Sequence, residues 1–398
     1  MRKITTHVRV SDARGYSRLA IDAAIGIASL VEVMHHNIAR RSGVFTRVTR
    51  QPARGITGFV YRSVRGVTRL VGTGIELVLG GLTPLFADDI SSRERDAVLS
   101  ALNGVLGDHL AATANPLAIP MQLRRNGHPL ESTPDALHGV TGKILLLVHG
   151  LCMNDLQWQR QGHDHGAALA ADGGFTPVYL RYNSGLHVST NGRVLAEKIE
   201  ALLQAWPVPV ESFAILAHSM GGLVTRSAVH YGELAHHQWP RQLRQIVFLG
   251  TPHHGAPLER AGNWIDRTLD SSPYTTAFAD LGKIRSAGIT DLRSGSLLDA
   301  DWQGKDRFAR SGQHHVPLPE GVACYAVAAV IAMQPGRSAN RLLGDGLVPL
   351  DSALGRDVGG RNPLAIPETR QWIGYGMNHM DLLDRKEVYS QLKKWLCD

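Results

Sequence analysis

The sequence has few cysteines and few aromatic residues. Its three cysteines, in a chain of 398 residues, are far apart at positions 152, 324 and 397. Such an odd, widely spaced set forms neither a disulfide framework nor the paired thiols of a zinc site. The basic first residues are not followed by an apolar signal core, so we expect an unsecreted protein of a reducing compartment.

Long apolar runs are also missing. The most apolar stretches, residues 19–33 and 70–82, are interrupted by Asp22, Glu32 and Glu76. A membrane-spanning helix needs roughly 18 or more consecutive apolar residues, so we expect no integral membrane insertion. Hydrophobic residues nevertheless make up 43% of the chain, which is enough for a sizeable core and excludes wholesale disorder.

Positive charge is concentrated at the N-terminus. Residues 1–70 carry 13 Lys or Arg against 3 Asp or Glu, whereas the remaining residues carry 29 against 32. Aromatic residues are not interleaved with these arginines as a base-stacking platform would require, so we expect no nucleic-acid partner. A packed, solvated helical face and docking on an anionic membrane or lipid surface both remain open. We accordingly expect a cytoplasmic protein, with peripheral membrane association as the alternative.

The first part of the chain has helical periodicity. Apolar residues recur at three- and four-residue steps in residues 16–41, 56–79 and 91–112, and arginines lie between them in the second segment. Prolines then mark residues 114–141 as a connector. We therefore predict a helical N-terminal extension with its connector over residues 1–138 and a second domain over 139–398.

The second domain alternates short apolar runs with longer helical patterns. The runs predict six strands, at residues 143–148, 176–182, 213–217, 245–249, 322–331 and 369–373. Helices are predicted between them, for example over 193–206 and 220–231. This alternation is typical of βαβ units, so the fold class is α/β with a mainly parallel central sheet.

One segment has the pattern of a nucleophile elbow. Residues 215–224 read Ile-Leu-Ala-His-Ser-Met-Gly-Gly-Leu-Val, an apolar strand, a sharp turn and an apolar helix. Ser219 occupies the turn, where small neighbours allow the strand and the helix to approach each other. Ala217 replaces the first glycine of the usual G-x-S-x-G pattern and is small enough to keep the elbow.

A serine hydroxyl needs a base and a group that orients that base. Asp345 follows the predicted strand 322–331 within a glycine-containing loop, and His379 follows the strand at 369–373. The order serine, acid, histidine along the chain is that of α/β-hydrolases, so Ser219, Asp345 and His379 are the candidate triad. Backbone N–H groups of Leu151 and Met220 are the candidate oxyanion hole.

Five motifs together carry a family resemblance. They are His149-Gly-Leu, Ala217-His-Ser-Met-Gly-Gly, Gly250-Thr-Pro-His-His-Gly, Asp345-Gly-Leu-Val with the later Ser352-Ala-Leu-Gly, and Asn378-His-Met-Asp. With these motifs residues 140–398 resemble the α/β-hydrolase superfamily, and within it bacterial lipases and GPI inositol-deacylase-like esterases. The resemblance implies hydrolysis of carboxylic or lipid esters through an acyl-enzyme without a cofactor. It also implies a helical cap over about residues 255–321.

Some site assignments have alternatives. Asp351 could replace Asp345 as the triad acid, and Asp345 could instead stabilise its own turn. Asp381 matches a position that binds calcium in some similar lipases, but Arg385 four residues later is a poor ligand. We therefore predict that Asp381 caps a helix and that no metal is bound.

The function also has alternatives. An acyltransferase, which passes the acyl group to an alcohol other than water, would use the same residues. A hydrolase of intracellular polyester or another lipid surface would give the basic N-terminal helices a docking role. In a different class, the chain would be a non-catalytic membrane or partner adaptor, although the complete candidate triad argues against that interpretation.

Overall fold

The computed structural model describes most of the chain after residue 92. The described residues are 15, 17, 18, 93–130, 137–256, 286–305, 314–334, 344–356 and 363–398. The helices expected over 16–41 and 56–79, and much of the expected cap, lie outside them. The chain divides into two compact units, of which one holds Asp96–His109 and Ile119–Asp398. The other holds the residues before 96 together with Leu110–Ala118.

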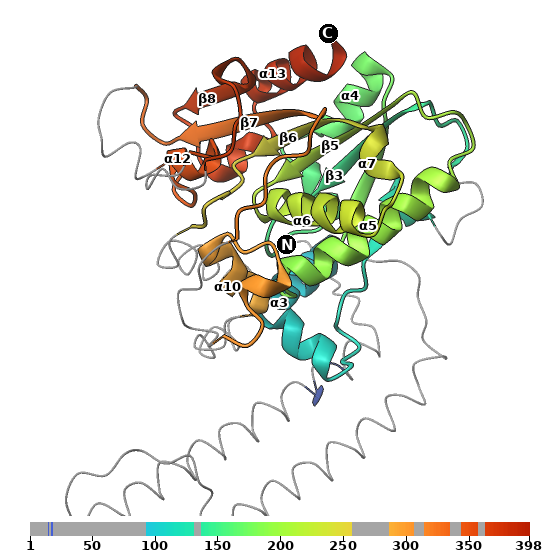
Figure 1. Ribbon diagram of the computed structural model, residues 1–398, viewed down its shortest axis with the longest axis vertical. Coiled ribbons are helices and arrows are strands. Elements are labelled where there is room, and N and C mark those ends of the chain that lie inside the picture. Colours follow the sequence, from blue (N-terminus) through green and yellow to red (C-terminus); the bar gives the residue numbers. More distant parts are fainter. Residues whose placement is uncertain are drawn as a thin grey trace, which may run out of the picture. The chain divides into compact units, whose positions relative to one another are not determined.

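An eight-stranded sheet forms the centre of the larger unit (Figure 1). Its strands lie in the order β2-β1-β4-β3-β5-β6-β7-β8, and those from β4 to β8 are parallel to one another. The short strands β1 and β2 pair in antiparallel fashion at one edge. The bounds are β1 Gln122–Arg125, β2 His128–Pro129, β3 Lys143–Val148, β4 Thr176–Arg181, β5 Ser212–His218, β6 Leu243–Leu249, β7 Ala323–Val330 and β8 Gln371–Tyr375.

Helices cover both faces of this sheet (Figure 1). Helices α5 (Val188–Gln204) and α6 (Met220–Leu234) pack on one face, and α4 (His165–Gly173) and α13 (Lys386–Cys397) pack on the other. The remaining described elements are α3 Arg93–Ala112, η4 Asp155–Trp158, α7 Trp239–Gln242, α10 Ala287–Ser294, η5 Asp299–Asp301, α12 Leu350–Ala353, η6 Glu368–Arg370 and η7 His379–Leu383.

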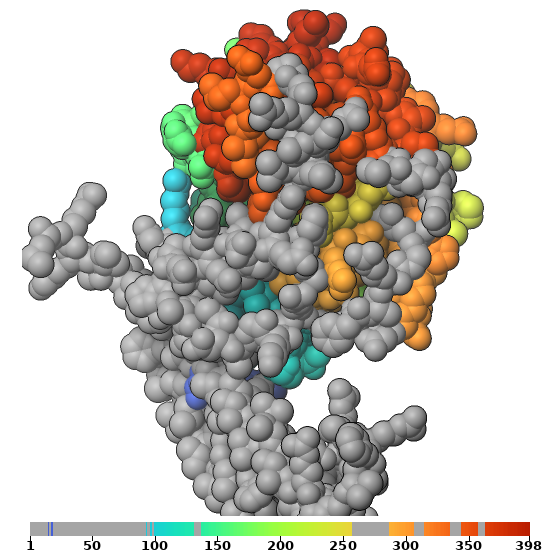
Figure 2. Space-filling view, turned by 90° about the vertical axis from the view of Figure 1, so that its left-hand side faces the viewer, coloured from blue at the N-terminus to red at the C-terminus, as the bar shows by residue number. Residues whose placement is uncertain are grey.

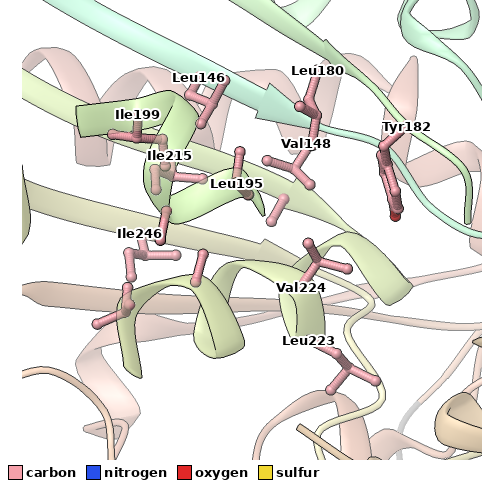
Figure 3. Close-up of a cluster of buried hydrophobic side chains, with 14 of the residues drawn as sticks. Leu146, Val148, Leu180, Tyr182, Leu195, Ile199, Ile215, Leu223, Val224 and Ile246 are labelled. Atoms are coloured by element: carbon pink, nitrogen blue, oxygen red, sulfur yellow. The ribbon is translucent and has the colours of Figure 1, made fainter. Parts of the chain in front are cut away.

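Strand β3 shows why the sheet is buried on both sides. Successive side chains of a strand point to opposite faces. Leu146 and Val148 join the core beneath α5 and α6, whereas Leu145 and Leu147 join the core beneath α4 and α13. Figure 3 shows the first of these cores, with residues of β3, β4, β5, β6, α5 and α6 interdigitated. A continuous apolar run is therefore what this central parallel strand requires.

The α/β class and the parallel sheet are confirmed, and the strand at 143–148 has the predicted bounds. The strand expected at 369–373 is displaced by two residues, to Gln371–Tyr375. The prediction of a simple connector over 114–141 was wrong, because β1 and β2 form a hairpin there. Asn126 and Gly127 both have positive φ, 52° and 79°, as a tight hairpin turn requires.

The described residues contain no helix that is long and apolar enough to span a bilayer. In the space-filling view the red C-terminal residues lie directly against the orange residues that precede them (Figure 2). This contact agrees with the pairing of β7 with β8, and it places the segments that follow these two strands next to each other. The candidate acid and the candidate base are on those two segments.

Candidate active site

Ser219 lies on a strained turn between β5 and α6. Its backbone has φ 55° and ψ −127°, a conformation that non-glycine residues rarely adopt. The neighbouring strand comes so close that a Cβ on Gly150 would be 2.9 Å from the Ser219 Cβ. A Cβ on Gly221 would similarly lie 2.4 Å from the carbonyl oxygen of Val148. Glycine at positions 150 and 221 is therefore what allows the elbow to form.

The substitution of alanine for the usual first glycine of the motif is accommodated. Ala217 is fully buried in β5, where it pairs with Val148 on one side and Phe248 on the other. The pairing of β5 with β6 continues past Ala217 to His218. The elbow thus needs glycine where the helix and the β3 loop approach, but not at this strand position.

Asp345 and His379 form a buried pair. The Nδ1 of His379 lies 2.6 Å from Oδ2 of Asp345, and the two residues are 4% and 2% exposed. The other carboxylate oxygen accepts hydrogen bonds from the N–H groups of Leu347 at 2.9 Å and Val348 at 2.8 Å. The His379 N–H also donates to the carbonyl oxygen of Asp345, at 3.1 Å. With Nδ1–H donated to the carboxylate, the neutral imidazole has its lone pair on Nε2.

His379 pairs with Asp345 and not with Asp351, the alternative acid. Asp351 belongs to the first turn of α12. Asp381 accepts a hydrogen bond from the Asn378 N–H at 2.9 Å and so caps η7, the short helix that begins with His379. Its predicted helix-capping role is confirmed.

Two further histidines shape the site. The ring of His218 lies 4.6 Å from that of His379, and its Nε2–H donates to the carbonyl oxygen of His379 at 3.3 Å. His149 donates from Nδ1 to the carbonyl oxygen of Gly150 at 2.9 Å. Burial lowers the pKa of His149 to about 3 and the pKa of His218 well below its ordinary value. Both rings are therefore neutral at physiological pH and hold backbone in place as hydrogen-bond donors.

His253 and His254, from the Gly250-Thr-Pro-His-His-Gly motif, are held by other contacts. His253 packs edge-on against Phe248 at a centroid distance of 4.7 Å. His254 lies within hydrogen-bond distance of the Gly355 carbonyl oxygen, at 3.2 Å. Neither is among the described residues that line the pocket at Ser219.

The two candidate oxyanion donors have no hydrogen-bond acceptor in the described part of the chain. Among the described residues, nothing accepts a hydrogen bond from the N–H of Leu151 or of Met220. Leu151 follows the end of β3, and Met220 is the first residue of α6, where a helix leaves its N–H groups unpaired. Buried amides are rarely left unpaired, so a free pair beside a serine indicates a place for an anionic ligand atom.

A small pocket joins these groups. Apart from the polar atoms of Ser219 and the two imidazoles, its described walls are apolar side chains. The lining residues are Leu151, Met153, His218, Ser219, Ala256, Leu292, Leu347, Val348 and His379. The structure thus brings Ser219, His379 and the Leu151 segment to one cavity, and Asp345 contacts His379 there without lining the cavity itself.

Sequence reasoning did not identify most of the apolar wall. Leu292 comes from α10, within the expected cap, and Ala256 lies at the beginning of that cap. Helical spacing in the cap could have identified Leu292 as a buried residue. The face it contacts is set by the packing of distant segments, so the sequence held no signal for its place in the pocket.

Part of the chain matches a known protein family. Residues 139–323 match the sequence model of the PGAP1-like alpha/beta domain. The matched region holds the elbow, the Leu151 segment and the expected cap, whereas Asp345 and His379 follow it. No curated protein matches the chain.

Several solved lipases and esterases are similar to the chain. The mature Bacillus licheniformis lipase BlEst2 is 19% identical, with 70% of this chain and 100% of that one covered and a TM-score of 0.42. Aspergillus fumigatus lipase B is 12% identical over 68% of this chain and 59% of its own, with a TM-score of 0.40. The metagenomic carboxyl esterase MGS0156 is 17% identical over 71% and 80%, with a TM-score of 0.37.

Proposed function

We propose that this protein is a serine-dependent hydrolase of carboxylic esters. The observation that carries the proposal is one pocket lined by the strained Ser219, by His379 with its buried partner Asp345 behind it, and by Leu151, whose N–H has no acceptor among the described residues. Ser219 is the nucleophile, His379 the general base and then acid, and Asp345 the group that orients His379. Leu151 and Met220 supply the oxyanion hole.

The chemistry has two halves. The Ser219 Oγ attacks the ester carbonyl carbon while His379 Nε2 takes the hydroxyl proton, and the N–H groups of Leu151 and Met220 donate to the oxyanion that forms. The protonated His379 then donates that proton to the leaving-group oxygen of the ester. The alcohol departs, and the acyl group stays on Ser219. Water, deprotonated by His379, then releases the carboxylic acid and restores the serine. Each oxyanion donor contributes about 2.7 to 4 kcal/mol to transition-state stabilisation in hydrolases of this type.

The pocket wall favours an apolar substrate. Leu151, Met153, Leu292 and Val348 surround the candidate nucleophile, and the described lining includes no Asp, Glu, Lys or Arg. A charged acyl group would lose its hydration there without gaining a partner. The substrate class is therefore an ester with an apolar acyl or alcohol group, as in simple lipids.

A burst experiment with chromogenic esters of increasing acyl length tests the proposal. We expect rapid release of one chromophore per protein molecule, followed by slower turnover, because acylation precedes deacylation. Mass spectrometry of the quenched burst should find the acyl group on the peptide that contains Ser219. An acyl group on another residue, or steady turnover with no acylated protein, would contradict the serine mechanism.

Added alcohols separate hydrolysis from acyl transfer in the same assay. With water as acceptor, the product is the free acid at every alcohol concentration. New ester formed in proportion to the alcohol would show instead that transfer is the main reaction.

A further inference from the structure

Helix α3 contacts the segment that contains the proposed oxyanion donor Leu151. A Cβ placed on Gly104 of α3 would lie 2.2 Å from the Cys152 Sγ and 3.0 Å from the Cys152 N and Cα. Four residues earlier, the Ser100 Oγ accepts a hydrogen bond from the Asn154 Nδ2 at 3.2 Å. Residues four apart lie on the same face of a helix, so one face of α3 holds both ends of the segment Cys152–Asn154.

The backbone of this segment is strained. Cys152 has φ 59°, in the left-handed region that glycine favours, and it is almost fully buried. Such a conformation persists only where the surrounding structure enforces it. The Cys152 N–H donates to the Ser184 Oγ at 3.0 Å, which fixes the peptide plane that begins at Leu151. The direction of the Leu151 N–H, one residue away, depends on this arrangement.

The loop that contains Ser184 also lies against α3. The Asn183 Nδ2 donates to the carbonyl oxygen of Gly107 at 2.9 Å. A Cβ on Gly185 would lie 2.1 Å from the carbonyl oxygen of Asn103. The helix therefore acts on Cys152 by two routes, directly through Gly104 and indirectly through Ser184.

A third contact joins α3 to the wall of the pocket. The Ser286 Oγ, at the N-terminus of α10, donates to the carbonyl oxygen of Gly104 at 2.6 Å. The Ala287 N–H donates to the Asp108 carboxylate at 3.0 Å. Helix α10 contains Leu292, which lines the pocket. Figure 1 shows α3 and α10 next to each other.

We propose that α3 is a built-in support of the oxyanion hole, and that Gly104 and Ser184 are positioning residues acting through Cys152 on the Leu151 N–H. This inference rests on the proposed function. Helix α3 precedes residue 139, where the family match begins, so the hydrolase domain would depend for its chemistry on a helix outside that match.

Gly104→Ala tests the direct route. Alanine is the better residue in a helix interior, so a purely local effect would stabilise the protein and leave turnover unchanged. The added methyl group instead meets Cys152 and should turn the Leu151 N–H away from the oxyanion. We expect kcat to fall about tenfold or more, with KM and the pH profile of kcat retained, because the loss is confined to the transition state.

The matched control is Gly232→Ala. Gly232 is also a helix glycine in close contact, since its added Cβ would lie 3.0 Å from the Trp239 ring, but it lies at the far end of α6. This control should keep wild-type kcat. A second substitution, Cys152→Ala, removes the Sγ that the new methyl group meets, so adding it to Gly104→Ala should restore part of kcat.

Ser184→Ala tests the indirect route without adding atoms. It removes the acceptor of the Cys152 N–H, and we expect a several-fold lower kcat with an unchanged KM. Wild-type kcat in both the Gly104→Ala and the Ser184→Ala proteins would overturn the inference. Failure of the proposed function has a different signature, namely a wild-type protein that shows no ester turnover at all.

Discussion

The two ends of the central sheet differ in how completely their backbone N–H groups are hydrogen-bonded. At the amino end, Thr141 donates from its N–H and its hydroxyl to Thr176 and Gly174, at 2.8 and 2.7 Å, and Trp206 donates to the carbonyl oxygen of Thr141. At the carboxyl end, Cys152 and Ser219 have positive φ, and Leu151 and Met220 have amides without acceptors among the described residues. Two strained residues and two amides without described acceptors therefore lie at the end of the sheet where we propose that the chemistry takes place.

The larger of two cavities at the sheet is not the one at Ser219. A cavity of about 250 Å³ lies near the start of β7, with Cys324 and Arg370 among its lining, whereas the pocket at Ser219 measures about 30 Å³. The smaller one contains Ser219, His379 and the Leu151 segment. In open α/β sheets ligands bind at the carboxyl ends of the strands, and the described side chains follow that rule.

The largest expected effect comes from replacing, in separate variants, the serines at the two ends of β5 by alanine. Ser219→Ala, directly after the carboxyl end of β5, should lower ester turnover at least about 1,000-fold while the fold persists, because the proposed nucleophile is lost. Ser212→Ala at the amino end of the same strand should leave turnover unchanged. Purified proteins compared by initial rates and by circular dichroism provide the measurement. Equal rates for Ser219→Ala and wild type would contradict the assignment.

A smaller but still large effect is expected from Asp345→Asn. The amide cannot hold His379 in the tautomer that leaves Nε2 free, so kcat should fall about 10³- to 10⁴-fold. Asp351→Asn, six positions further along the same segment, is the matched control and should retain activity. Steady-state kinetics on one chromogenic ester distinguish them. If Asp351→Asn were the more damaging change, the triad acid would have to be reassigned.

Stability at acid pH should also depend on a buried histidine near the carboxyl ends of the strands. His165 donates from Nε2 to the Leu382 carbonyl oxygen at 3.0 Å, and burial lowers its pKa from 6.5 to about 4. Between those values the unfolded chain binds a proton that the folded protein excludes, so the free energy of unfolding falls as the pH drops. This one residue accounts for at most about 3 kcal/mol of that loss.

His165→Gln removes this titration and retains an N–H donor. Urea unfolding at pH 7 and at pH 4.5 should therefore show a smaller loss of stability in the variant than in the wild type. Identical losses would mean that other buried histidines, such as His149 and His218, determine the acid sensitivity.

The smallest effect is expected at the satisfied amino end. Thr176→Val leaves the Thr141 N–H without the acceptor it now has at 2.8 Å. The free energy of unfolding should fall by about 1 to 2 kcal/mol, while kcat stays at the wild-type value because the site is at the other end of the sheet. A drop in kcat larger than the loss of folded protein would show that the two ends are coupled.

Much of the fold could be read from local patterns. The strand at 143–148 and the start of the helix at Met220 have their predicted positions, because a continuous apolar run and a small-residue elbow are both short-range signals. The hairpin of β1 and β2 was missed although Asn126-Gly127 marks it. Its four-residue strand alternates too briefly for periodicity to reveal.

The candidate site was likewise only partly predictable from the sequence. Ser219 and Met220 are covalent neighbours, so the motif alone places them together, and the chain order of the fold suggested Asp345 and His379. The sequence did not decide whether Asp345 or Asp351 pairs with His379. The loop after β7 turns Asp345 inward, and its carboxylate lies against the His379 ring. The apolar wall formed by Leu292 and Met153 had no sequence signal.

The sequence by itself determined the α/β class, the elbow and the order of the candidate catalytic residues, because these depend on residues within a few positions or on a fixed topology. The tertiary structure alone decided that α3 packs at Cys152 and that Ser184 holds its N–H. Those contacts join residues 32 to 51 positions apart in the chain. They form only when the whole domain folds, since no local pattern specifies which distant side chain fills the space beside a glycine.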